Sequence, residues 1–204
     1  MRLYAVVVPP ADEVARLFQS VGAHADETLT WAEAGSIRIG LGYFGNLTDS
    51  DVFKLSARLT AEVGLVESLE LRFSGGGALE EAGDDTVWAG IEGDKDELRA
   101  LALKIAEAGR REGFLVDRRW YKPRARLAAI NDTTTAAGLE NTVARLTAYE
   151  GQPWRTTSIA LIEPRKSNDS HAGQLFDTYG TLQLLSRGDA TSVPKASWSS
   201  AQAR

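Results

Sequence analysis

Residues 36–44 read SIRIGLGYF, and apolar residues alternate in this stretch with small or charged ones. A period of two is typical of a β-strand whose two faces meet different surroundings. One face carries Ile37, Ile39, Leu41 and Tyr43. The other face carries Arg38, Gly40 and Gly42. An arginine among glycines predicts a face that opens onto solvent or onto a cleft.

A second arginine-bearing strand is predicted in the other half of the chain. Residues 119–130 read RWYKPRARLAAI, in which Pro123 is tolerable at the entry or edge of a strand. Arg124 and Arg126 share one face of this strand. Both arginine strands follow a comparable strand and helix, so the chain is predicted to contain an approximate internal duplication.

The other predicted elements make an α+β chain. Strands are predicted over residues 2–8, 69–74, 86–92, 154–163 and 179–185, and helices over 11–21, 49–63, 96–113 and 139–149. Residues 75–77 are three glycines without the Lys-Ser/Thr of a phosphate-binding loop, so they predict a turn. Residues 1–185 are predicted to form a single domain, and the Ser- and Ala-rich residues 186–204 a disordered C-terminal tail.

Composition excludes several classes of protein and of site. The 204 residues are 43% hydrophobic and 25% charged, as in a globular chain and unlike a disordered or fibrous one. No apolar run approaches the ~20 residues of a membrane-spanning helix, so we expect a cytoplasmic protein that does not enter a membrane. The chain has no cysteine and only two histidines, His24 and His171, which excludes thiolate and histidine-rich metal sites. We predict neither a metal nor a cofactor.

The net charge of −5 hides an asymmetry between the halves. Residues 1–100 carry 8 Lys/Arg and 18 Asp/Glu, whereas residues 101–204 carry 15 and 10. Basic residues crowd into residues 110–126, namely Arg110, Arg111, Arg118, Arg119, Lys122, Arg124 and Arg126. Such a density indicates either an anion-binding surface or a solvated helix end followed by a charged edge strand.

Several short stretches carry a family resemblance through their order and spacing. They are residues 1–9 (MRLYAVVVP), 41–45 (LGYFG), 69–77 (LELRFSGGG), 87–91 (VWAGI), 113–114 (GF) and 158–163 (SIALIE). Over residues 1 to about 185, the chain resembles the two-histidine (2H) phosphoesterase superfamily, specifically the bacterial RNA 2′,3′-cyclic phosphodiesterases, also called 2′-5′ RNA ligases. The resemblance implies a bilobal, pseudo-symmetric α+β fold with antiparallel sheets, helices packed on the outside and a central cleft.

The two motifs that carry the chemistry of this family are both changed here. In the family, two His-x-Thr/Ser motifs face each other across the cleft; one histidine is a general base, the other a general acid, and the hydroxyls hold the phosphate. The corresponding residues 38–40 and 124–126 read RIG and RAR. Arginine stays protonated near neutral pH and cannot exchange a proton as histidine does, but its planar fork fits phosphate oxygens.

The resemblance therefore implies a phosphate site without the usual acid and base. Its expected residues are Arg38, Gly40, Arg124 and Arg126, and either Arg124 or Arg126 occupies the place of the second histidine. Tyr43, Trp120 and Tyr121 are candidates for stacking a base. His171 remains a candidate for replacing a lost histidine.

Three functions are compatible with these features. The first is binding of a nucleotide or of an RNA end through its phosphate, without catalysis. The second is an active cyclic phosphodiesterase or ligase in which arginines stabilise the transition state. The third is a scaffold for other proteins whose cleft holds no ligand.

Overall fold

A computed structural model describes residues 1–23, 27–80, 83–114, 121–164, 176–187 and 196–198 of the chain. Its helical elements are α1 (Ala11–Val21), the short 3₁₀ helix η1 (Ala34–Ser36), α2 (Asp49–Val63), α3 (Lys95–Arg111) and α4 (Ala136–Thr147). The first strands are β1 (Arg2–Val7), β2 (Thr30–Trp31), β3 (Ile39–Asn46), β4 (Leu69–Ala78) and β5 (Thr86–Gly93). The later strands are β6 (Arg124–Ala129), β7 (Trp154–Thr156), β8 (Ser158–Pro164), β9 (Phe176–Gln183) and β10 (Ala196–Trp198).

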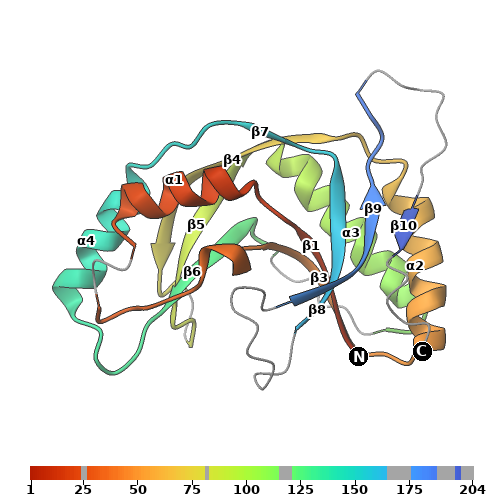
Figure 1. The fold of residues 1–204 in the computed structure, drawn as a ribbon, viewed down its shortest axis with the longest axis horizontal. Coiled ribbons are helices and arrows are strands. Elements are labelled where there is room, and N and C mark those ends of the chain that lie inside the picture. The colour runs from red at the N-terminus through yellow and green to blue at the C-terminus, as the bar shows by residue number, and fades with distance from the viewer. Residues whose placement is uncertain (24–26, 81–82, 115–120, 165–175, 188–195, 199–204) are drawn as a thin grey trace.

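The strands form one curled sheet in two halves (Figure 1). One half has the order β10-β9-β8-β1-β3, and the other has the order β6-β5-β4-β7, with β2 also paired to β6. All pairs of named strands are antiparallel. The halves meet between β3 and β6, where the registered pair is Ile39 with Ala125. The predicted α+β class with antiparallel strands is confirmed, and its two halves belong to a continuous sheet.

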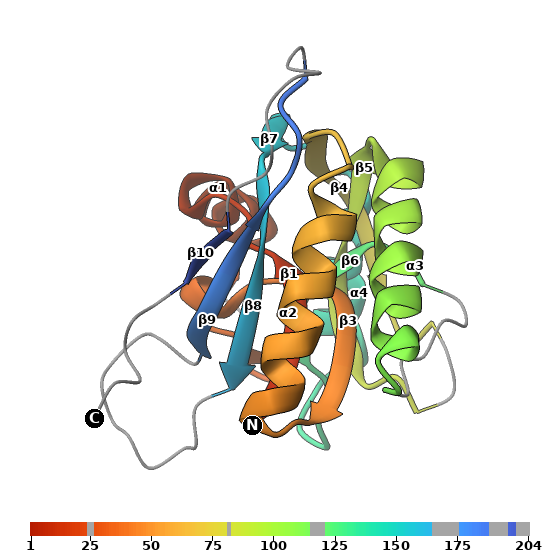
Figure 2. The ribbon, with the colours of Figure 1, turned by 90° about the vertical axis from the view of Figure 1, so that its right-hand side faces the viewer.

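The helices pack on the outside of this sheet, as predicted. Helices α2 and α3 lie side by side against the half that contains β3 and β9 (Figure 2). Helix α4 packs on β4 of the other half, and α1 contacts α4. Helix α1 follows β1, a strand of the first half, but it lies on the side of the second half with α4 (Figure 1). Each half is therefore built from segments that are not continuous in the sequence.

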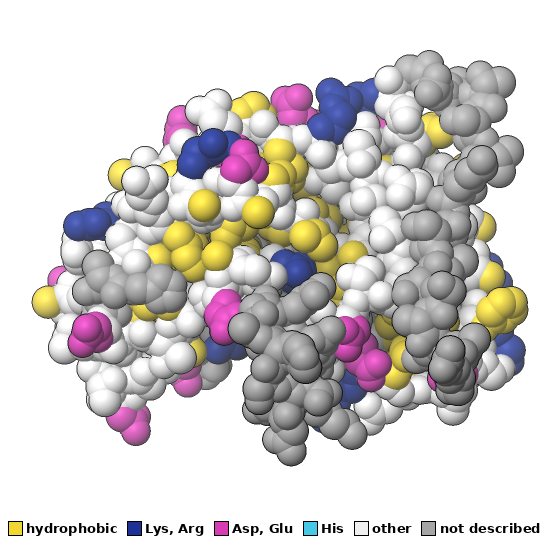
Figure 3. Space-filling view, viewed as in Figure 1, with side chains coloured by type: hydrophobic (Ala, Val, Ile, Leu, Met, Phe, Trp, Pro, Cys, Tyr) yellow, Lys and Arg dark blue, Asp and Glu magenta, His cyan; other side chains and the backbone are white. Residues whose placement is uncertain are grey.

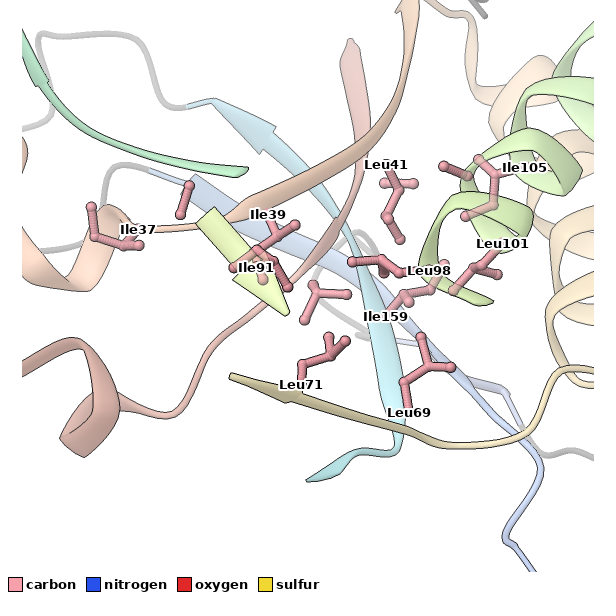
Figure 4. Packing of buried hydrophobic residues seen from close by; sticks show 14 of the residues in the cluster. Ile37, Ile39, Leu41, Leu69, Leu71, Ile91, Leu98, Leu101, Ile105 and Ile159 are labelled. Carbon is pink, nitrogen blue, oxygen red and sulfur yellow. The ribbon is translucent and has the colours of Figure 1, made fainter. Parts of the chain in front are cut away.

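A continuous hydrophobic core fills the space between the helices and the sheet. Figure 4 shows the part of this core where α3 meets the strands. Its labelled side chains include Leu98, Leu101 and Ile105 of α3 and the strand residues Leu41, Leu69 and Ile159. Each of these helical residues is completely buried, as the apolar stripe at three- and four-residue spacing predicts.

Local chain signals explain where the helices begin and end. Helix α2 starts in a capping box, because Thr48 accepts from the backbone of Asp51 while the Asp51 carboxylate accepts from the backbone of Thr48. Beyond the C-terminus of α3, Gly113 has a φ of +90°, which favours glycine. Helix α1 differs, since its N-cap position is Pro10 and no side-chain hydrogen bond caps it.

Two predicted elements differ from the structure, and the predicted tail contains a short strand. Residues 75–77 do not form a turn; they continue β4, which has a bulge between Phe73 and Gly76. The predicted strand 154–163 is divided at Thr157 into β7 and β8, which pair with different halves. Within the tail 186–204, which was predicted to be disordered, Ala196–Trp198 forms β10 and pairs with β9.

The glycines of β4 and β5 allow these two strands to approach each other closely. A Cβ on Gly76 would lie 2.4 Å from the backbone oxygen of Trp88, and one on Gly90 would lie 2.5 Å from that of Ser74. A Cβ on Gly77 would lie 3.0 Å from the Trp88 ring. The glycine run is therefore a packing surface for β5 and for the Trp88 side chain, which explains why it lies in a strand.

No helix in the described parts of the chain has both the length and the apolar character needed to cross a membrane.

We expect Gly90→Ala to lower the free energy of unfolding by about 1–3 kcal/mol, because the added Cβ meets backbone atoms that cannot rotate away. Gly40→Ala is the matched control, since nothing lies within 4 Å of its added Cβ, and we expect a change within about 0.5 kcal/mol. Urea unfolding of both variants measures the difference. Equal stability of the two variants would contradict the close approach of β4 and β5.

Candidate functional site

A pocket of about 340 Å³ opens on the concave face of the sheet at the junction of its halves. The residues that line it come from β3, β5, β6 and the segments just before them. They are Arg38, Gly40, Asp84, Thr86, Trp88, Lys122, Arg124 and Arg126. The four residues that the sequence assigned to a phosphate site thus lie together in one pocket.

The pairing of Ile39 with Ala125 explains how distant residues reach this pocket. Both residues are completely buried, so their neighbours along each strand point to the opposite, open face. Antiparallel strands run in opposite directions, so the residue before Ile39 lies opposite the residue after Ala125. Arg38 is therefore near Arg126, and Gly40 is near Arg124. The approximate two-fold axis of this pair exchanges Arg38 with Arg124, so Arg124 is the positional equivalent of Arg38.

Arg124 is held by acidic and aromatic neighbours. Its Nη1 donates to Asp84 Oδ2 at 3.1 Å and to Glu80 Oε2 at 3.2 Å. Asp84 is held in turn by the Thr86 hydroxyl, which donates to its Oδ1 at 2.5 Å. The Arg124 guanidinium also lies 5.8 Å from the centre of the Trp88 ring, within the range of a cation–π contact. These contacts fix Arg124 as part of the pocket wall.

Glu80 also neutralises the neighbouring lysine, since Lys122 Nζ lies 2.7 Å from Glu80 Oε1. Lys122 and Arg124 thus share two carboxylates, those of Glu80 and Asp84.

Arg38 has a different environment. Its Nη1 donates to the backbone oxygen of Ile37 at 2.7 Å, and its guanidinium lies 5.7 Å from the centre of the Phe176 ring. Its Nε is buried and makes no hydrogen bond, and burial lowers the pKa of the guanidinium from its ordinary value. Among the described residues no carboxylate pairs with Arg38 or with the exposed Arg126.

Tyr43 lies on the open face and not on the buried face that simple alternation predicted. The registers Ala5 with Gly42 and Val6 with Gly40 leave Leu41 as an extra residue of β3, and this bulge reverses the side to which Tyr43 points. Tyr43 is 45% exposed and its ring stacks on that of Tyr4, with 4.5 Å between the centres.

A small apolar cluster continues the surface beside this aromatic pair. It consists of Val6, Ala160 and Ile162 with Tyr4 and Phe176 packed against them. Figure 3 shows hydrophobic side chains gathered near the centre of the face seen in Figure 1, with a basic side chain beside them. The open face therefore combines cationic groups with an aromatic and apolar surface.

Of the remaining candidates, Tyr121 is described by the structure and does not line this pocket. Tyr121 packs against the main core, and its hydroxyl is buried without a hydrogen-bond partner. Trp120 and His171 lie outside the described residues, so their proposed roles stay predictions. No group of three His, Asp or Glu side chains that could hold a metal ion occurs in the described ranges.

Four residues at this site were not among the predicted site residues: Asp84, Thr86, Trp88 and Glu80. Trp88 alternates with the buried Val87 and Ala89, so its place on the open face could have been inferred from the period of β5. Asp84 and Glu80 lie between two strands, and no local pattern distinguishes them from ordinary surface acids. Their role depends on a contact with Arg124, which lies 40 or more residues away along the chain.

A second hollow of about 240 Å³ adjoins the pocket and shares Trp88, Lys122 and Arg124 with it. Its further basic residues are Lys95, whose Nζ lies 2.7 Å from Glu92, and Arg99, which lies 2.6 Å from Asp96. Each of these cations is paired with a carboxylate, in contrast to Arg38.

No family model and no curated protein sequence matches the chain. Solved structures do match it, and they show the fold: the chain folds like Escherichia coli LigT and a phosphoesterase. The predicted resemblance is confirmed at the level of the fold.

The matching structures include Escherichia coli LigT in complex with 3′-AMP, at a TM-score of 0.70 and 16% identity over 90% of this chain and 97% of LigT. A phosphoesterase matches at 0.69 and 14% identity over 90% and 98%. A protein of Thermus thermophilus, TT0787, matches at 0.63 and 17% identity over 90% and 97%. Other crystal structures of LigT contain NADP⁺, ATP or phosphate.

We expect Tyr121→Phe to raise the free energy of unfolding by about 1 kcal/mol at pH 7, because it removes a buried hydroxyl without a partner. Burial also raises the pKa of Tyr121 above its ordinary value, so the unfolded chain loses this proton first as the pH rises. The wild type should therefore lose stability above about pH 10, where unfolded tyrosine ionises, and the advantage of the variant should grow. Urea unfolding at pH 7 and pH 10.5 measures both effects.

Tyr43→Phe, at an exposed ring, is the control for this experiment and should change the stability little at either pH. A loss of stability in Tyr121→Phe at pH 7 would show that the hydroxyl has a partner after all.

Proposed function

We propose that this protein is a degenerate 2H-phosphoesterase-like protein that binds a phosphate-bearing ligand, a nucleotide or an RNA end, in its arginine-lined pocket. We also propose that the protein does not carry out the histidine-based cyclic phosphodiesterase reaction. The observation that carries it is the pair of arginines, Arg38 and Arg126, that face one pocket from two strands without a carboxylate partner among the described residues.

The unpaired state of Arg38 is the physical basis of the proposal. A half-buried cation has lost part of its hydration, and a buried Nε without a hydrogen bond adds to this cost. A phosphate in the pocket offsets the lost hydration, because its oxygens accept the charge-assisted hydrogen bonds that a guanidinium fork donates. Arginines kept only for packing would be expected to have carboxylate partners, as Arg124 has.

The comparisons support the same class of ligand. LigT, which shares the fold, has been crystallised with 3′-AMP, ATP, NADP⁺ and phosphate. The stacked rings of Tyr43 and Tyr4 offer a surface for an unpaired base about 10 Å along β3 from Gly40, a distance that a nucleotide spans. We propose a cytoplasmic location for the protein, because nucleotides and RNA ends occur in the cytoplasm.

The pocket residues explain why binding is proposed in place of turnover. Arg38 and Arg124 stand at the positions of the two histidines, and neither releases a proton near neutral pH. Among the described residues, the carboxylates of Asp84 and Glu80 contact Arg124, and both accept hydrogen bonds from it. Each of these carboxylates is thus occupied by an ion pair with Arg124.

We expect the protein to bind 3′-AMP more tightly than adenosine, and Arg38→Ala to weaken binding of 3′-AMP by about tenfold to a hundredfold. Isothermal titration calorimetry measures the dissociation constants. Arg155→Ala is the matched control, since Arg155 lies on β7 at the edge of the sheet beside Glu70, outside the pocket. Equal binding of 3′-AMP by wild type and Arg38→Ala, with both variants folded, would exclude this function.

We further expect no turnover of a short RNA that ends in a 2′,3′-cyclic phosphate, even at high protein concentration, because arginines stand where the family has its acid and base histidines. Chromatography separates the cyclic end from its opened product. Product that forms with wild type and disappears with Arg38→Ala and Arg124→Ala would establish the alternative function, an active phosphodiesterase that uses arginines.

A further inference from the structure

The charges around the pocket divide into a balanced group and an unbalanced one. Lys122 and Arg124 are neutralised by Glu80 and Asp84 through contacts of 2.7 to 3.2 Å. Arg38 and Arg126 have no such partner in the part of the chain that the structure describes. Within the described residues, two positive charges are thus left without compensation.

The two uncompensated arginines can act on one group. They flank the Ile39–Ala125 pair, and the antiparallel direction of β3 and β6 places them on the same side of it. Both line the same pocket of about 340 Å³. The Phe176 ring lies against the Arg38 guanidinium, which restricts the directions in which Arg38 can point.

We propose that the pocket selects a terminal phosphate monoester dianion over a cyclic or internal phosphodiester. This inference rests on the proposed function, because it specifies which phosphate the same site takes. It departs from the cyclic phosphate that the family resemblance implies.

Charge and geometry both favour the monoester. Near pH 7 a phosphate monoester carries a charge of about −1.5 to −2 and has three terminal oxygens. A diester, cyclic or internal, carries one negative charge and has only two such oxygens. On a monoester, each of two guanidinium forks can bind two oxygens if both forks bind one oxygen in common. On a diester, both forks compete for the same two terminal oxygens.

The balanced group supports this selection. Asp84 is fixed by Thr86 and by Arg124, so its negative charge stays at the wall of the pocket. The carboxylates of Glu80 and Asp84 neutralise the positive charges of Lys122 and Arg124. The pocket therefore has two uncompensated positive charges, where it would otherwise have four. A site with four free cations would attract any anion strongly, whereas a site with two is matched to a dianion.

The test compares three probes that share base and sugar: 3′-AMP, adenosine 2′,3′-cyclic monophosphate and adenosine. Calorimetry at pH 7.5 should give dissociation constants at least about tenfold lower for 3′-AMP than for the cyclic compound. Equal affinity for the two phosphates overturns the selection but leaves the proposed function intact. Failure of both phosphates to bind more tightly than adenosine overturns the proposed function and this inference together.

Arg126→Gln reduces the uncompensated positive charge of the pocket from two to one. It should therefore weaken the binding of 3′-AMP more than the binding of the cyclic phosphate, and the two affinities should come within about threefold of each other. Arg155→Gln, outside the pocket, should leave the ratio unchanged, and thermal unfolding of both variants checks that they are folded. A ratio that Arg126→Gln does not change would overturn the assignment of Arg126.

A pH series gives an independent readout. A phosphate monoester takes up its second proton near pH 6, so the affinity for 3′-AMP should fall by up to about tenfold between pH 7.5 and pH 5. The cyclic phosphate keeps one charge throughout. The other charged groups around the pocket, Glu80, Asp84, Lys122 and Arg124, face both probes, so the ratio of the two affinities largely cancels their contribution. A ratio that does not change with pH would overturn the selection of the dianion.

Discussion

The pairing of Ile39 with Ala125 is the constraint on which the site depends. These two buried residues join the halves of the sheet, and every charged group proposed to bind phosphate lies next to one of them or contacts a residue that does. Because an antiparallel pair has its own two-fold symmetry, one backbone contact places two equivalent tripeptides, 38–40 and 124–126, around a common space. The two halves of the sheet thus meet at the pocket itself.

Much of this arrangement follows from the sequence. The period of two around Ile39 and around Ala125 identifies both strands and the faces of Arg38, Arg124 and Arg126, because alternation is a local property of the chain. Helix α2 is equally local, with its cap at Thr48 and its apolar stripe. Such signals are readable without a fold because each depends on residues a few positions apart.

Other features depend on contacts between distant segments. The glycines 75–77 favour a turn when read alone, and only the close approach of β5 and the Trp88 ring explains their place in a strand. Asp84 and Glu80 resemble ordinary surface acids until Arg124 lies beside them. The side on which Tyr43 lies depends on a bulge opposite β1, and alternation within β3 cannot indicate an extra residue.

The bulge at Leu41 also bears on how such a site changes over time. Upstream of it, Gly40 faces the pocket; downstream of it, Tyr43 faces the same side although the two positions differ by an odd number. Loss of one residue at this point would restore strict alternation and turn the tyrosine ring toward the core, while the arginine positions kept their register with β6. Chain length in β3 can therefore alter which part of a ligand is recognised without any change in the residues that bind its charge. Insertions and deletions, and not substitutions alone, are then a route by which this architecture acquires new specificity.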